Sequence, residues 1–110
     1  MTPKVRKERG ASIIELYGSL DMTTSDEARR VFRETVDGDP RLILIDLGGL
    51  EFLKSSGFQA LYELLDLTRE SGIPLAVIGP HEGIRSIMNV FNLDRSLPVY
   101  ASIEEALEDM

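Results

Sequence analysis

The sequence has 110 residues, of which 43% are hydrophobic and 28% are charged, and it carries a formal net charge of −7. This length supports one hydrophobic core, so we expect a single domain over residues 1–110. The acidic balance argues against a nucleic-acid partner, because phosphate contacts need several cations on one surface. The absence of cysteine excludes disulfides and cysteine-bound metals. No apolar run reaches the roughly 18 residues of a membrane span, and none follows the basic start as in a signal peptide, so we expect a cytoplasmic protein without membrane insertion.

The chain opens with "MTPKVRKERG", in which four cations surround Val5. We interpret this segment as a short edge strand that its charges keep soluble, in preference to a specific basic docking patch. A glycine then turns the chain back into a strand over 12–18, so the first two strands form a hairpin. In the next segment, Thr24 and Glu27 have the spacing of a capping box, which predicts a helix that ends at Gly38.

The rest of the chain alternates apolar strands with amphipathic helices. Residues 41–49 form a nearly continuous apolar run, as expected for a central strand buried on both faces of a parallel sheet. The remaining predicted elements are a helix after Ser55, a strand at 74–80, a helix at 84–91, a short strand at 99–100 and a helix that Ser102 caps. This order predicts an α/β fold with one mixed, mostly parallel sheet of four to five strands and about four helices. Residues 47–57 are expected to be a connection at the carboxyl ends of the strands, where functional residues gather.

The sequence lacks the residue patterns of common enzyme classes. Its only histidine is His81, which we interpret as a helix-start residue rather than a catalytic base. No G-x-S-x-G elbow or P-loop occurs, and a tight turn explains the pair Gly48-Gly49. Asp46 lies where a receiver domain has its phosphorylated aspartate, but no acidic pair follows the first strands to hold magnesium. We therefore interpret Asp46 as an acceptor of loop hydrogen bonds and expect no catalytic residue, no metal site and no cofactor.

The segment "EFLKSSGFQALYELLDL" at residues 51–67 raises a question, because two serines stand together before a helix. A serine hydroxyl at a helix start can accept a free amide N–H, which stabilises the helix by about 1 kcal/mol. One serine is enough for that role. The other, beside Lys54, would stand at the positive end of the helix dipole, where a phosphate could be accommodated. Capping and modification both remain open from the residues alone.

Three segments carry a family resemblance: "YGSLDMTTSDEARRVF", "LILIDLGGLEFLKSSGFQALYEL" and "GIPLAVIGPHEGIRSIMNVFNLDRSLPVYASIEEAL". The first is similar to the G-x-L-D and following helix of the STAS family of anti-sigma factor antagonists. The second resembles the strand, the D-L pair and the D-[ST]-[ST]-G helix start of that family, and the third its last strand and two helices. Together they span nearly all of the chain from residue 12 and imply a STAS-like single domain.

The resemblance implies a protein-binding switch that is not an enzyme. The unphosphorylated domain would hold an anti-sigma factor that is also a serine kinase, and so release the sigma factor. The kinase would then phosphorylate Ser55, and a phosphatase would reverse the modification. The other residues expected to bind the partner or to shape the binding surface are Asp21, Thr23, Thr24, Lys54, Ser56, Gly57 and Phe58. Phe58 also fits the apolar stripe of its helix and is therefore a core candidate.

Lys54 departs from the family pattern, which usually has an acid before the phosphoacceptor. The exchange reverses the local charge and leaves three consequences open: a stronger phosphoserine site, a partner with an altered acidic surface, or constitutive binding because kinase recognition is lost. The alternative function is a STAS scaffold, or a subunit of a transporter or signalling assembly, that is not phosphorylated. We expect a monomer or a weak dimer.

Overall fold

The computed structural model describes residues 2–110, apart from the side chain of Asp94, and contains one five-stranded sheet. The strands are β1 (Lys4–Glu8), β2 (Ala11–Leu20), β3 (Leu42–Leu53), β4 (Leu75–Ile78) and β5 (Val99–Tyr100). The helices are α1 (Ser25–Asp37), α2 (Ser55–Ser71), α3 (Glu82–Val90), α4 (Leu93–Ser96) and α5 (Ile103–Asp109). The sheet has the order β1-β2-β3-β4-β5, and only β1 is antiparallel to its neighbour. The predicted α/β fold, its opening hairpin and its central third strand are confirmed.

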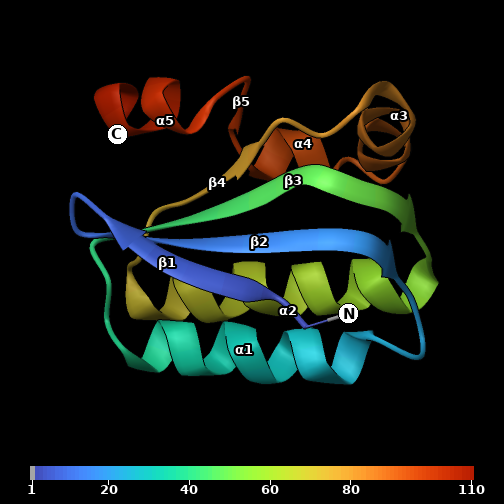
Figure 1. The fold of residues 1–110 in the computed structure, drawn as a ribbon, viewed down its shortest axis with the longest axis horizontal. Coiled ribbons are helices and arrows are strands. Elements are labelled where there is room, and N and C mark those ends of the chain that lie inside the picture. The colour runs from blue at the N-terminus through green and yellow to red at the C-terminus, as the bar shows by residue number, and fades with distance from the viewer. Residues whose placement is uncertain (1) are drawn as a thin grey trace.

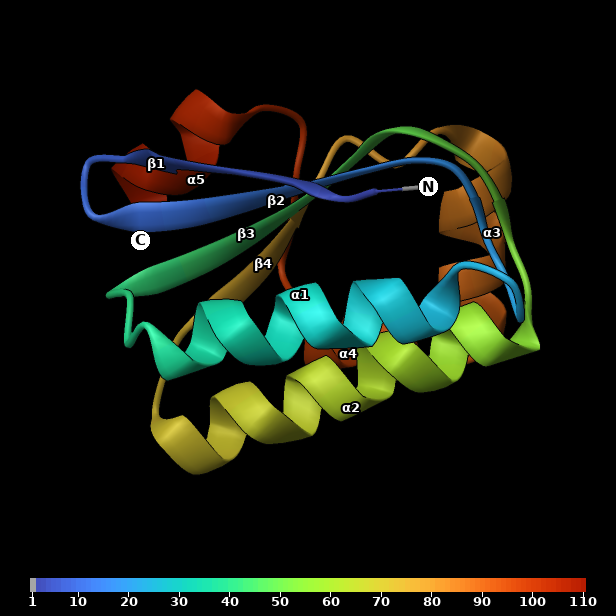
Figure 2. The same ribbon diagram turned by 60° about the horizontal axis from the view of Figure 1, so that its bottom comes forward.

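Helices cover both faces of the sheet (Figures 1 and 2). On one face, α1 and α2 lie side by side and pack against the larger core, which includes Phe32, Leu50 and Leu64 and extends to residues of α3 and α4. On the other face, α5 covers a smaller core to which Ile13 and Leu44 contribute. Because β2 and β3 send residues into both cores, their sequences are apolar at nearly every position. None of the helices within residues 2–110 has the length and the apolar content needed to cross a bilayer.

The interpretation of Gly48-Gly49 as a tight turn is wrong, because β3 continues through both glycines to Leu53. The pairing between β2 and β3 shifts there: Glu15 pairs with Asp46, but Tyr17 pairs with Gly49, so β3 has one extra residue at this point. Such a bulge is stabilised when a side chain satisfies the extra backbone group. Here the Asp46 carboxylate accepts the Gly48 N–H at 2.9 Å, which confirms its predicted role as a local acceptor.

The longer β3 also changes the expected connection at residues 47–57. Only Lys54 lies between the end of β3 and the start of α2, so the chain passes almost directly from strand to helix. The short helix α4 was not anticipated. It is separated from α3 because Asn92 adopts a left-handed backbone conformation (φ 58°), which asparagine tolerates better than most residues. At the last helix, the predicted cap is confirmed, since the Ser102 hydroxyl accepts the Glu105 N–H at 3.1 Å.

The start of α2 is pressed against the end of β2. The Lys54 N–H donates to the Leu20 carbonyl at 3.0 Å, and the first hydrogen bond within α2 runs from the Phe58 N–H to the Lys54 carbonyl. Gly57 is buried in the first turn of this helix. A Cβ atom at Gly57 would lie 2.5 Å from the Leu20 carbonyl oxygen and 2.9 Å from the Leu53 side chain. Glycine is therefore required because the helix and the strand approach too closely for any side chain.

We predict that Gly57→Ala lowers the free energy of unfolding by about 1–3 kcal/mol, because the new methyl group must push backbone apart. Urea denaturation followed by circular dichroism measures this loss. Gly38→Ala is the matched control, since Gly38 has φ −72° and a Cβ there would make only an ordinary 3.4 Å contact with the Thr35 carbonyl. The control should change stability by less than about 1 kcal/mol. Equal stability of the two variants would contradict this account of Gly57.

Candidate partner-docking site

Ser55 is the first residue of α2, and its side chain is exposed to solvent. Neither it nor the half-buried Ser56 caps the helix, so the capping role expected for one of these serines is wrong. The cap position belongs to Lys54, which has an extended backbone (φ −101°, ψ 174°) and makes no side-chain cap hydrogen bond. Lys54 sits at the cap because β3 extends to Leu53 and leaves no other residue before the helix. The Ser55 hydroxyl is thus available for chemistry rather than occupied by the fold.

The start of α2 is electropositive. The first amide N–H groups of a helix lack internal acceptors, and no side chain caps them here. The helix dipole adds a partial positive charge, and the first turn of α2 contains no acid to offset it. The exposed Lys54 side chain supplies a full positive charge at the same point. An anion bonded to Ser55 would therefore meet backbone N–H groups and a cation within a chain that is acidic as a whole.

The turn that follows β2 lies beside this helix start and is held rigid by Asp21. The Asp21 carboxylate accepts the Thr23 N–H at 2.9 Å and the Thr23 hydroxyl at 2.6 Å. These hydrogen bonds, the Thr23 hydroxyl first, hold the pKa of Asp21 below its usual value because they favour the charged carboxylate. Thr24 occupies the N-cap position of α1 without capping it, so the predicted capping box with Glu27 is wrong. Its hydroxyl instead accepts the Asp21 N–H at 3.0 Å and donates to the Ser19 carbonyl at 2.9 Å.

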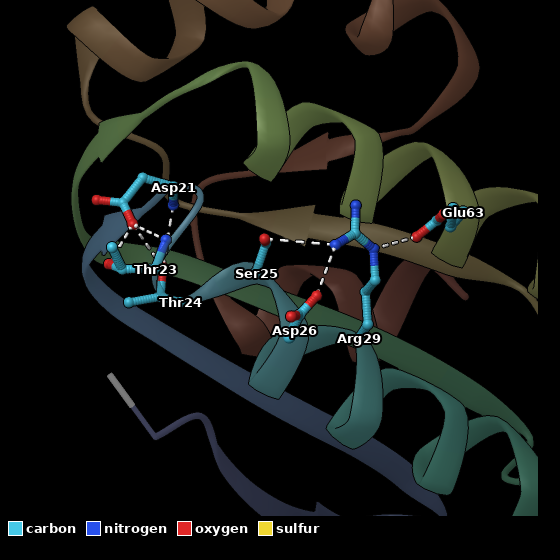
Figure 3. A network of polar contacts seen from close by, with 7 residues as sticks. All are labelled: Asp21, Thr23, Thr24, Ser25, Asp26, Arg29 and Glu63. Carbon is cyan, nitrogen blue, oxygen red and sulfur yellow. Dashed lines mark hydrogen bonds and ion pairs between the residues drawn. The ribbon is translucent and has the colours of Figure 1, made fainter.

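A second network ties α1 to α2 just behind this turn (Figure 3). The Arg29 guanidinium donates to Glu63 on α2, and on its own helix it pairs with Asp26 at 3.2 Å. It also lies 3.4 Å from the hydroxyl of the buried Ser25. The hydrogen bond to Glu63 is the main reason that the pKa of Arg29 lies above its usual value. The cross-link joins the first part of α1 to the middle of α2, while the hydrogen bond from the Lys54 N–H to the Leu20 carbonyl joins the start of α2 to the strand end before the Asp21 turn.

Exposed apolar side chains flank the serine. Met22, in the Asp21 turn, is 79% exposed, and Phe52, near the end of β3, is 55% exposed. Phe52 lies opposite Ser19 in the β2–β3 register, which places it at the end of the sheet where Ser55 begins its helix. The sequence reasoning missed Phe52 because it ended the strand at 49. Leu50 and Leu53 are buried three positions apart with two exposed residues between them, so the sequence carries no period-two signal for the longer strand.

Phe58 lies in the core rather than on the surface, since only 7% of it is exposed. Its ring packs against that of Phe91 at the end of α3, with centroids 4.5 Å apart. Phe91 is 53% exposed, and its carbonyl accepts the Tyr62 hydroxyl at 2.6 Å. Among the residues expected at the docking surface, Gly57 and Phe58 therefore support it from beneath. The apolar contact that a partner could reach next to them is Phe91, which the sequence reasoning did not single out.

His81 is the N-cap of α3, as predicted for a helix-start residue. Its Nδ1 accepts the N–H groups of Gly83 at 3.0 Å and Ile84 at 3.4 Å, and its Nε2 lies 3.3 Å from the Glu51 carbonyl. Both ring nitrogens are therefore engaged in structural contacts at this helix start. Among the side chains that the structure describes, which leave out Asp94, no group of three or more histidines, aspartates or glutamates has the arrangement of a metal site.

The exposed and half-buried residues around the start of α2 form one surface, which we call the α2 docking surface. It consists of Asp21, Met22, Thr23, Phe52, Lys54, Ser55, Ser56 and Phe91. It gathers at one end of the sheet because β2 and β3 run parallel and both end there (Figure 1). A hydroxyl, a cation and three apolar side chains stand on a rigid base. This combination can bind a protein and carry a modification, while its one carboxylate, Asp21, is engaged by the Thr23 N–H and hydroxyl.

Comparisons with known proteins agree with this geometry. Residues 2–106 match the family model described as the STAS domain. The chain is 26% identical to the anti-sigma F factor antagonist of Paenibacillus polymyxa over 108 residues, covering 97% of this chain and 92% of that protein. The crystal structure of an anti-sigma factor antagonist from Mycobacterium paratuberculosis is 28% identical, with a TM-score of 0.82, over 98% of this chain and 92% of the other. An anti-sigma-factor antagonist (STAS) domain protein from Planctomyces limnophilus is 25% identical with a TM-score of 0.88, over 99% and 98% of the two chains. A match over almost the whole length, on a fold with the same elements, leads to one conclusion: this chain belongs to the STAS domain family.

Proposed function

We propose that this chain is an anti-sigma factor antagonist that binds an anti-sigma factor kinase through the α2 docking surface and is switched off by phosphorylation of Ser55. The observation that carries the proposal is the exposed Ser55 at the first position of a 17-residue helix whose start has no side-chain cap. The relatives named as anti-sigma factor antagonists support the same function. The kinase would transfer the γ-phosphoryl group of ATP to the Ser55 hydroxyl and release ADP, and the antagonist itself would contribute only that hydroxyl.

Binding depends on the apolar part of the docking surface. Met22, Phe52 and Phe91 are all more than half exposed, and covering them with a partner removes apolar area from water. Met22 lies in the turn held by Asp21, Phe52 belongs to β3, and Phe91 packs against Phe58, so each side chain has its place before the partner arrives. A preformed surface loses little conformational entropy on binding. The partner thus meets a rigid apolar surface whose edge carries Lys54 and Ser55.

Phosphorylation reverses the binding through local electrostatics. A phosphate on Ser55 adds about −1.5 to −2 charges at the edge of this apolar surface. Within the free domain, the helix N–H groups and Lys54 stabilise the dianion, so the fold remains intact. In the complex, the same dianion must be desolvated, or it must lie against partner groups that complement an unmodified serine. A loss of about 1.4 kcal/mol already weakens binding tenfold.

Lys54 decides how the modified state differs from that of relatives with an acid at this position. The cation stabilises a neighbouring phosphate instead of repelling it, so we propose that phosphorylated Ser55 is held close to the helix start. The kinase surface that meets Lys54 would then be acidic or neutral, since a basic surface would be repelled. Because Lys54 would stabilise the phosphate, we favour a regulated antagonist over the alternative in which kinase recognition is lost and the domain binds constitutively.

We predict that Ser55→Ala binds the anti-sigma factor kinase of the same cell like the wild type, whereas Ser55→Glu binds at least about tenfold more weakly. Isothermal titration calorimetry without ATP measures both affinities. Ser71→Glu is the matched control, because Ser71 is an exposed serine at the opposite end of the same helix. Incubation with kinase and ATP, followed by phosphopeptide mapping, should modify the wild type at Ser55 only. An unmodified wild type, or undiminished binding by Ser55→Glu, would instead favour the scaffold or transporter-subunit role.

The proposed phosphate environment can be measured separately. With phosphoserine installed at position 55 by semisynthesis, the second phosphate pKa should lie below the ordinary value of about 6, because the helix start and Lys54 favour the dianion. Lys54→Gln should raise that pKa toward the ordinary value, as followed by 31P NMR across a pH series. Arg85→Gln, which removes an exposed cation on α3, is the control and should leave the pKa unchanged. A phosphate that titrates alike in all three proteins would mean that it points away from Lys54.

A further inference from the structure

From the exposed edge of β1 and the groove beside it, we infer a second docking site, which binds an extended acidic segment of a partner protein as an added β-strand. The site lies on the far side of β2 from β3 and contains none of the residues of the α2 docking surface (Figure 1). It does not rest on the function proposed for Ser55. β1 forms one edge of the sheet, and four of its five residues are exposed. An edge strand presents a row of backbone N–H and C=O groups that can pair with another strand.

A groove of about 530 Å³ lies between β1 and the second half of α1. Its lining includes Val5 and Lys7 from β1, Ser12 from β2, and Val31 and Thr35 from α1. Val5 is 46% exposed there although it points to the side of the sheet that carries the larger core. No strand beyond β1 covers the groove beside the second half of α1. A strand added beside β1 would extend the sheet over this groove and bury Val5.

The register of β1 defines which side chains the added strand needs. Val5 pairs with Ile14 and Lys7 pairs with Ser12, so both face the groove. Lys4 and Arg6 pair with Glu15 and Ile13 and face the opposite side. Since successive residues of a strand alternate between faces, a partner strand needs apolar side chains next to Val5 and acidic ones next to Lys4 and Arg6. An extended segment with alternating acidic and apolar residues meets both requirements.

The charge of the edge selects this occupant. Lys4, Arg6, Lys7 and Arg9 are exposed along β1 and the turn that follows it, in a chain whose net charge is −7. The exposed Arg41, just before β3, donates to the Arg9 carbonyl of this turn at 2.7 Å. Glu8 offsets part of this charge through its 3.2 Å ion pair with Arg6. Glu34 and Asp39 line the groove itself, so the acidic side chains of the added strand belong on the opposite face, beside Lys4 and Arg6. A second copy of this chain is a disfavoured occupant, because pairing two β1 strands would bring two net-positive strands together. In an antiparallel pair centred on the middle residue of β1, Arg6 of one copy would face Arg6 of the other. An anionic bilayer or a nucleic-acid duplex is also disfavoured, because such a broad surface would approach the acidic remainder of the chain and be repelled by it. A single extended strand would contact only the basic edge.

The probe for this site is the peptide Ac-EVEVEVE-NH2, titrated into the 15N-labelled full chain. We expect amide shift changes in β1 and at the groove residues Val31 and Thr35, and none around Ser55. The peptide Ac-EEEVVVE-NH2 has the same composition without the alternation, so it should bind at least about tenfold more weakly. The double variant K4E/R6E should also weaken binding of the alternating peptide at least about tenfold. R85E/R95E changes the net charge equally on α3 and α4, and it should bind like the wild type.

Circular dichroism and thermal unfolding of each variant establish that it is folded before binding is measured. Several results would overturn the inference: no binding of the alternating peptide, equal binding of both peptides, or equal effects of the two double variants. The inference also fails if vesicles of phosphatidylcholine and phosphatidylglycerol bind the chain through β1 while the peptide does not. Sedimentation that shows self-association through β1, abolished by K4E/R6E, would replace the acidic partner with a second copy.

Discussion

The close approach of α2 to the end of β2 is the constraint on which the rest of the structure depends. Gly57 has no side chain because the Leu20 carbonyl occupies the space that a Cβ would need. The Lys54 N–H donates to that same carbonyl, so the Leu20 oxygen contacts the start of α2 at both Lys54 and Gly57. This packing fixes the position of the first turn of α2, and no side chain caps it there. That turn is left with free N–H groups at the surface, next to Ser55.

The chemistry of the docking surface follows from this packing. A helix start without a cap or an acidic first turn keeps its positive potential, and Lys54 adds to it. The Asp21 turn and the Arg29 cross-link then fix the neighbouring elements, so the apolar residues Met22 and Phe52 stand at defined positions. Such a surface can be stable when bare, able to bind when bare, and tolerant of a phosphate. All three properties arise from backbone geometry and few side chains, so the proposed switch needs no conformational change in the domain.

Periodicity in the sequence predicted most of the fold, because each buried strand and each amphipathic helix carries its pattern locally. It failed where a contact distant in sequence decides the local structure. Gly48-Gly49 has the composition of a turn, yet pairing with β2 draws it into a bulge that the Asp46 carboxylate stabilises. Thr24 and the serine pair have the composition of caps, but the Asp21 turn uses the threonine, and the serines lie one and two positions inside the helix. The position of Ser55 at an exposed helix start was predictable, whereas Phe52 and Phe91 beside it depended on tertiary packing.

The proposed switch requires that the partner contacts the surface around Ser55 and that phosphate on this residue breaks the contact. Cross-saturation NMR can follow both steps in one sample, with the labelled antagonist bound to its unlabelled kinase, before and after the addition of ATP. We expect signals of Met22, Phe52, Ser55 and Ser56 to be attenuated in the first state and to recover as phosphoserine forms. Attenuation centred on another face, or contacts that persist once Ser55 is fully phosphorylated, would contradict the switch.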